Sequence, residues 1–144
     1  MALQHGIGPA PTTRRCHEPA LATQAEGPPL PPVLERLFGL IAEPVRRLEA
    51  APDDHLTVRE IGLLLGDVLD WVDADRTILH AADRLYDAAF ALHDARQRRS
   101  TCASLTDRTM QARADAVPVA LAAFRASLST AKPNARARAR CITW

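Results

Sequence analysis

The amino-acid sequence predicts an all-α fold, either a three-helix bundle or an elongated helical hairpin with a long central helix, flanked by flexible arms. Apolar side chains recur at helical spacing in three segments, and clusters of Pro, Asp, Ser and Thr separate these segments. No glycine or proline falls between Asp67 and Val117, so backbone chemistry forces no break there. The predicted organisation is a flexible arm over 1–30, a single helical domain over 31–131 and a basic C-terminal tail over 132–144.

Residues 1–30 are rich in proline and glycine, which cannot sustain a helical or an alternating apolar pattern, so a flexible arm is expected. The same residues interrupt any apolar run long enough for a secretory signal. No run elsewhere approaches the roughly 20 residues that span a bilayer, so no membrane partner is expected. Three widely spaced cysteines, Cys16, Cys102 and Cys141, do not suggest a disulfide framework. The expected compartment is therefore the reducing cytoplasm.

The first helix is predicted over residues 32–50. Pro31 and Pro32 stand where a first helical turn tolerates proline, and large apolar residues follow at helical spacing. These apolar residues are Leu34, Leu37, Phe38, Ile41, Val45 and Leu48. Pro44 removes one backbone hydrogen bond near the middle, so a kink or two short helices are expected there.

The central helix is predicted over residues 57–98 and has the longest apolar periodicity in the chain. Its start reads as a capping box, in which Thr57 and Glu60 satisfy each other's backbone N–H groups. A helix of about 40 residues would span roughly 60 Å, more than a monomer of this size can cover. The apolar stripe therefore predicts self-association, most simply an antiparallel homodimer.

Two polar residues, Asp75 and His93, fall within the apolar stripe of this central helix. A polar residue at such a position can fix the register or the oligomeric state at a cost in stability. Alternatively, the stripe is exposed to solvent at those levels. The sequence favours neither interpretation.

The last helix is predicted over residues 103–130, after a segment of Ser, Thr and Cys that favours a turn. Its apolar residues alternate at spacings of four and three along one seam: Met110, Ala114, Val117, Leu121, Phe124 and Leu128. Pro118 lies within this seam, so it is expected to kink the helix or to begin its second half.

Charge is divided unequally along the chain. Residues 1–95 carry a net charge of −7, and residues 96–144 carry +8. Such asymmetry suggests either internal complementarity or a basic tail for an anionic partner. The candidate contacts for that partner are Arg96, Arg98, Arg99, Lys132, Arg136, Arg138 and Arg140. In an extended tail, the last three would project to one side.

The acidic residues of the central segment do not predict a metal site. Carboxylates and a histidine on facing helices can bind a di-iron centre, but such sites use a Glu-x-x-His pattern that the sequence lacks. The set Asp67, Asp70, Asp73, Asp83, Asp87 and His80 is better read as a solvated acidic face. No catalytic residue, cofactor or metal is predicted.

The function that best fits these patterns is a non-enzymatic helical interaction module, of the adaptor, chaperone or inhibitor type, which binds another protein or itself. Its candidate packing or contact residues are Trp71, Leu85, Tyr86 and Phe124. The alternative is a small DNA-associated regulator that binds nucleic acid through the Arg-rich C-terminal region. An apolar interface would tolerate salt, whereas phosphate binding would weaken steeply with it.

Overall fold

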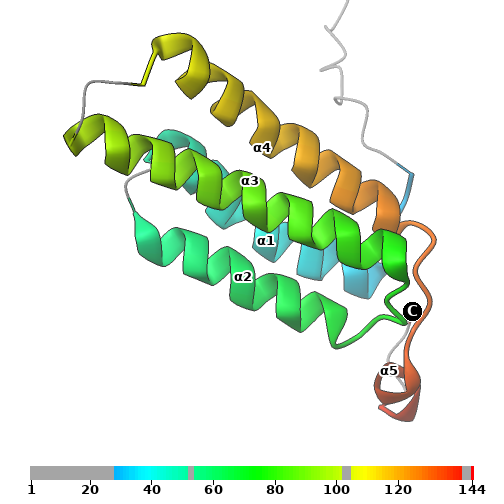
Figure 1. The fold of residues 1–144 in the computed structure, drawn as a ribbon. Helices are drawn as coiled ribbons and strands as arrows, with labels where there is room; N and C mark the ends of the chain where they lie inside the picture. Colours follow the sequence, from blue (N-terminus) through cyan, green and yellow to red (C-terminus); the bar gives the residue numbers. More distant parts are fainter. Residues whose placement is uncertain (1–27, 52–53, 102–104, 141–143) are drawn as a thin grey trace, which may run out of the picture.

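The computed structural model describes residues 28–51, 54–101, 105–140 and 144. It confirms an all-α helical bundle. The helices are α1 (Pro32–Ala50), α2 (His55–Leu69), α3 (Arg76–Thr101), α4 (Asp107–Leu128) and the short α5 (Ala135–Ala139). The first four lie side by side, and consecutive helices run in opposite directions (Figure 1), as short connections require. Most of the predicted N-terminal arm, 1–30, lies outside the described residues.

The bundle has one core, to which all four long helices contribute. Helix α3 packs most extensively on α4, and α1 on α2, whereas the seam between α2 and α3 is less extensive. The largest fully buried side chains are Leu34, Ile41, Val45, Leu48, Ile61, Val68, Ile78, Leu85, Leu92, Val117, Phe124 and Leu128. The core has few aromatic side chains. Buried alanines, including Ala82 and Ala89, let the helices approach closely, so the core is filled without them.

Neither internal proline divides its helix. Pro44 is buried within a continuous α1, so the predicted pair of short helices does not form. Pro118 lies within a continuous α4 and does not start a second half. Buried residues on both sides of each proline, such as Ile41 and Val45, hold the helix together across the missing hydrogen bond.

The prediction of one central helix over 57–98 is wrong, because the chain turns between α2 and α3. Asp75 immediately precedes α3 and caps its start: its Oδ1 accepts a hydrogen bond from the Ile78 N–H at 2.9 Å. Aspartate ends or starts helices through such local hydrogen bonds and needs no glycine or proline to do so. Asp75 is therefore a helix cap, and the 60 Å helix from which a dimer was predicted does not exist.

The start of α2 also differs from the prediction. The N-cap is Asp54, whose Oδ1 accepts from the Leu56 N–H at 2.9 Å and whose Oδ2 accepts from the Thr57 hydroxyl at 2.8 Å. These hydrogen bonds, that of Thr57 first, lower the pKa of Asp54. The predicted capping box of Thr57 and Glu60 is wrong, because Glu60 instead forms an ion pair with Arg47 at 2.6 Å.

The predicted flexible C-terminal tail is folded against the α2–α3 connection over residues 132–140 (Figure 1). The Asp73 N–H donates to the Lys132 carbonyl at 2.8 Å, and the Asn134 N–H donates to the Trp71 carbonyl at 3.2 Å. The Asn134 side-chain amide also donates to the Asp70 carbonyl at 2.7 Å. These hydrogen bonds satisfy the exposed backbone of the connection and fix the tail in place.

Candidate interaction surface

Exposed large apolar side chains gather on α2 and α3. Among the described residues they are Leu40, Leu56, Leu63, Leu79, Tyr86, Phe90 and Val119. Five of these seven belong to α2 and α3. The spacings within each helix, seven residues on α2 and seven then four on α3, place them on one side of that helix. We call this set, Leu56, Leu63, Leu79, Tyr86 and Phe90, the α2–α3 face.

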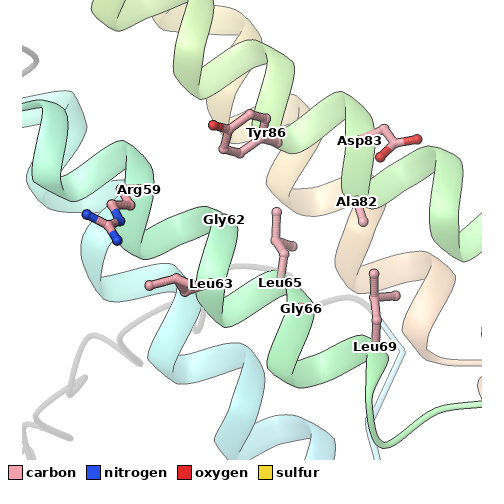
Figure 2. A pocket seen from close by; sticks show the side chains of 9 residues that line it. All are labelled: Arg59, Gly62, Leu63, Leu65, Gly66, Leu69, Ala82, Asp83 and Tyr86. Atoms are coloured by element: carbon pink, nitrogen blue, oxygen red, sulfur yellow. The ribbon is translucent and has the colours of Figure 1, made fainter.

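A groove of about 460 Å³ runs along the seam beneath this face (Figure 2). Its lining residues are Arg59, Gly62, Leu63, Leu65, Gly66, Leu69, Ala82, Asp83 and Tyr86. We call it the α2–α3 groove. Its walls are mostly apolar: Leu65 and Leu69 of α2 point toward α3, and Ala82 of α3 points back toward them (Figure 2).

The two glycines of α2 shape the groove differently. A Cβ at Gly62 would lie 2.9 Å from Tyr86 Cε2, so the absence of a side chain lets the tyrosine ring approach α2. A Cβ at Gly66 would meet nothing within 4 Å, so this position leaves the groove open. Leu63 and Phe90 were not predicted as contact residues, because periodicity does not show which side of a helix faces solvent.

Two opposite charges mark the two ends of the groove. Arg59 lies near the start of α2, and Asp83 lies on α3 next to Ala82, at the level of the later part of α2 (Figure 2). This placement follows from the antiparallel direction of the helices, since Tyr86 already lies opposite Gly62. An apolar channel therefore separates a positive end from a negative end.

A second hollow, of about 490 Å³, lies between α3 and α4. It is lined by Thr77, His80, Ala81, Arg84, Val119, Ala120, Ala123, Ala126, Ser127 and Thr130. Small side chains line most of this hollow, and Val119 is the one large exposed apolar side chain of the described residues that it offers to a partner.

The four predicted contact residues separate into three environments. Leu85 and Phe124 are fully buried in the core, so they stabilise the fold and cannot reach a partner. Trp71 is half-buried under the C-terminal segment. Tyr86 is 39% exposed and alone among the four belongs to the α2–α3 face. Sequence periodicity could not separate them, because adjacent rows of one stripe can be buried or exposed.

The predicted basic contacts include three arginines that form ion pairs within the chain. Arg98 pairs with Asp94 at 2.9 Å, and Arg99 pairs with Asp107 at 2.6 Å. Arg136 pairs with Asp70 at 3.1 Å. Two further candidates, Arg96 and Lys132, are exposed to solvent.

Arg136, Arg138 and Arg140, in α5 and at its C-terminal cap, do not project to one side, as an extended tail would require. Arg136 and Arg140 lie one helical turn apart, and their guanidinium groups lie 5.4 and 5.5 Å from the centroid of the Trp71 ring. Arg138 instead donates to the Pro133 carbonyl at 2.6 Å. Two of the three arginines are thus engaged with one tryptophan.

Comparison with protein-family models, curated proteins and solved structures finds no match for this chain. Within the described ranges, no group of three or more His, Cys, Asp or Glu side chains is arranged to hold a metal ion. No helix in those ranges is long and apolar enough to cross a membrane.

Proposed function

We propose that this protein is a non-enzymatic helical interaction module, of the adaptor, chaperone or inhibitor type, and that the α2–α3 face is its contact surface. The observation that supports this proposal is the gathering of five large exposed apolar side chains on two neighbouring helices, two of which, Leu63 and Tyr86, line one groove. Exposed apolar side chains that gather in one region mark interaction sites, whereas single exposed apolar residues are ordinary.

The shape of the groove suits a helix or an extended apolar side chain of a partner. A helix that docks in a groove inserts side chains spaced three or four residues apart, and the row of leucines along α2 offers complementary apolar walls. Tyr86 adds an aromatic surface with a polar tip, a combination enriched at binding hot spots. Leu63 and Tyr86 are the residues expected to contribute most to affinity.

The alternative, a DNA-associated regulator, has less support. Arg98, Arg99 and Arg136 already pair with carboxylates of the chain, and a phosphate would have to compete with these ion pairs. Exposed ion pairs contribute little free energy, so a phosphate can displace the carboxylate from such a pair. The discriminating quantity is the salt dependence of binding, which is steep for phosphate contacts.

The test is site-specific photocrosslinking in cells with a photoreactive amino acid at position 63 or at position 40. Leu63 is 63% exposed on α2 and Leu40 is 53% exposed on α1, so the two sites are matched in residue type and accessibility. The expected result is a discrete crosslinked protein at position 63 that is absent at position 40. That protein, once purified, should bind the full chain, and Leu63→Glu should abolish binding while Leu40→Glu preserves it.

Two results would contradict the proposal. In the first, position 63 gives no discrete crosslink, or the same products as position 40. In the second, the full chain binds duplex DNA with an affinity that falls steeply with salt and is unaffected by Leu63→Glu, which would favour the nucleic-acid alternative.

A further inference from the structure

We propose that the α2–α3 face docks a second copy of this chain across a two-fold axis, with Leu63 of each copy inserted into the α2–α3 groove of the other. This inference rests on the proposed function and names the partner at the same site. Leu63 projects from the groove's wall, and the hollow over Gly66 lies on the same surface. A two-fold interface requires such self-complementarity, because each copy presents the same patch.

The charges of the groove fit the same symmetry. A two-fold axis that lies in the plane of the interface and runs across the helices exchanges the two ends, so the Arg59 end of one copy meets the Asp83 end of the second copy, and the reverse pair forms at the other end. Both charges stand at the rim of an apolar channel, where opposite charges fix register and disfavour other partners. A parallel arrangement of the two copies would instead bring ends of like charge together.

The apolar residues beyond the groove fit the arrangement as well. Leu56 and Phe90 lie beyond the Arg59 end, and Leu79 lies beyond the Asp83 end. The two-fold axis therefore places Leu79 of each copy opposite Leu56 and Phe90 of the other. All five residues of the α2–α3 face would be covered, with Gly66 allowing the second copy's α2 to come close.

The experiment is a charge-reversal cycle on the full chain, followed by sedimentation velocity from micromolar to high micromolar concentration at low and moderate salt. The variants are Arg59→Glu, Asp83→Arg and the double variant. We expect a dimer for the unmodified chain and about tenfold or greater weakening for each single variant, which opposes two like charges. The double variant should recover most of the affinity, since it restores opposite charges at both ends.

Both positions are exposed, and circular dichroism would establish that each variant retains the helical fold. A monomer at every concentration would overturn the self-docking, as would single variants that dimerise like the unmodified chain or a double variant no better than either single one. If the chain is monomeric and position 63 still crosslinks to another protein, self-docking fails and the proposed function stands. A dimer with the expected charge dependence, and no crosslinked protein other than a second copy, supports self-docking and contradicts binding of a different protein at this face.

Discussion

Gly62 and Gly66 occupy equivalent interior positions of α2 and differ in what a methyl group would contact. An interior glycine costs a helix about 1 kcal/mol relative to alanine. Gly66→Ala should therefore raise the free energy of unfolding by up to about 1 kcal/mol, since the new Cβ would meet nothing within 4 Å. Gly62→Ala should gain less, because its Cβ would lie 2.9 Å from Tyr86 Cε2 and the ring would have to move. Urea denaturation of each variant measures the difference.

Gly39→Ala in α1 is the matched control, because its Cβ would also meet nothing within 4 Å. It should stabilise the chain about as much as Gly66→Ala. Equal stabilisation at positions 62 and 66 would contradict the close approach of Tyr86 to α2. Because stability must be compared in one oligomeric state, the measurements belong at a concentration where each variant is monomeric.

Asp54 gives the start of α2 a dependence on pH. A carboxyl group whose pKa is lower in the folded state contributes stability above its unfolded pKa, and this contribution is lost as the pH falls through the folded value. Asp54→Asn still provides a cap but does not titrate. Its melting temperature should therefore fall less than that of the unmodified chain between about pH 5 and pH 3.

Circular dichroism melts at several pH values would measure this difference. Asp87→Asn, which removes an equal charge from an exposed position on α3, controls for the change in net charge. The account of the cap would be contradicted if Asp54→Asn and the unmodified chain lost stability in parallel as the pH falls.

At the scale of elements, the C-terminal segment and α5 cover one side of Trp71. Replacing Arg136 and Arg140 by alanine removes both guanidinium groups from the ring and should expose the indole to water. In a Trp144→Phe background, where Trp71 is the remaining tryptophan, we expect emission shifted to longer wavelength and a lower melting temperature.

Arg138→Ala is the control for this experiment, because Arg138 belongs to the same short helix and contacts the Pro133 carbonyl instead of the ring. It should leave the emission maximum unchanged. If Arg138→Ala shifted the emission as far as the double variant does, the effect would come from loss of α5 and not from the ring contacts.

The helices themselves were largely predictable, whereas the break between α2 and α3 was not. Periodicity identifies α1 and α4, because each buries one continuous stripe. The apolar rows, however, continue in register across the connection, from Val68 to Ile78. The signal for the break was the cluster of Asp70, Asp73 and Asp75, whose side chains favour caps over helix interiors. Aspartate is common both on the solvated face of a helix and at helix caps. The cluster was therefore compatible with one continuous helix and with a break between two helices.

At the scale of the whole molecule, the charge asymmetry is partly neutralised within the chain. Arg125 pairs with Glu35 at 2.9 Å and lies over the Phe38 ring at 5.2 Å, which joins α4 to α1. Arg136 pairs with Asp70 and joins the C-terminal segment to the α2–α3 connection. In each case a cation from the basic part of the chain meets an anion from the acidic part, so internal complementarity accounts for part of the pattern.

The interaction surface could be predicted only in part, because periodicity does not distinguish a core from an interface. Leu85 and Tyr86 are neighbours in adjacent rows of one stripe, yet the first is buried and the second exposed. Leu63, Leu64 and Leu65 are consecutive leucines of which only the first is exposed. The packing of four helices decides which row faces outward, and that packing depends on the turn at Asp70 to Asp75.

The most direct test of the self-docking surface is an isotope-filtered nuclear Overhauser experiment on an equal mixture of labelled and unlabelled full chain. The two-fold arrangement predicts intermolecular contacts from the Leu63 methyl groups to groove residues such as Ala82, and none from Leu40. Intermolecular contacts confined to the Val119 side of the bundle, or none at concentrations where the chain is fully associated, would contradict it.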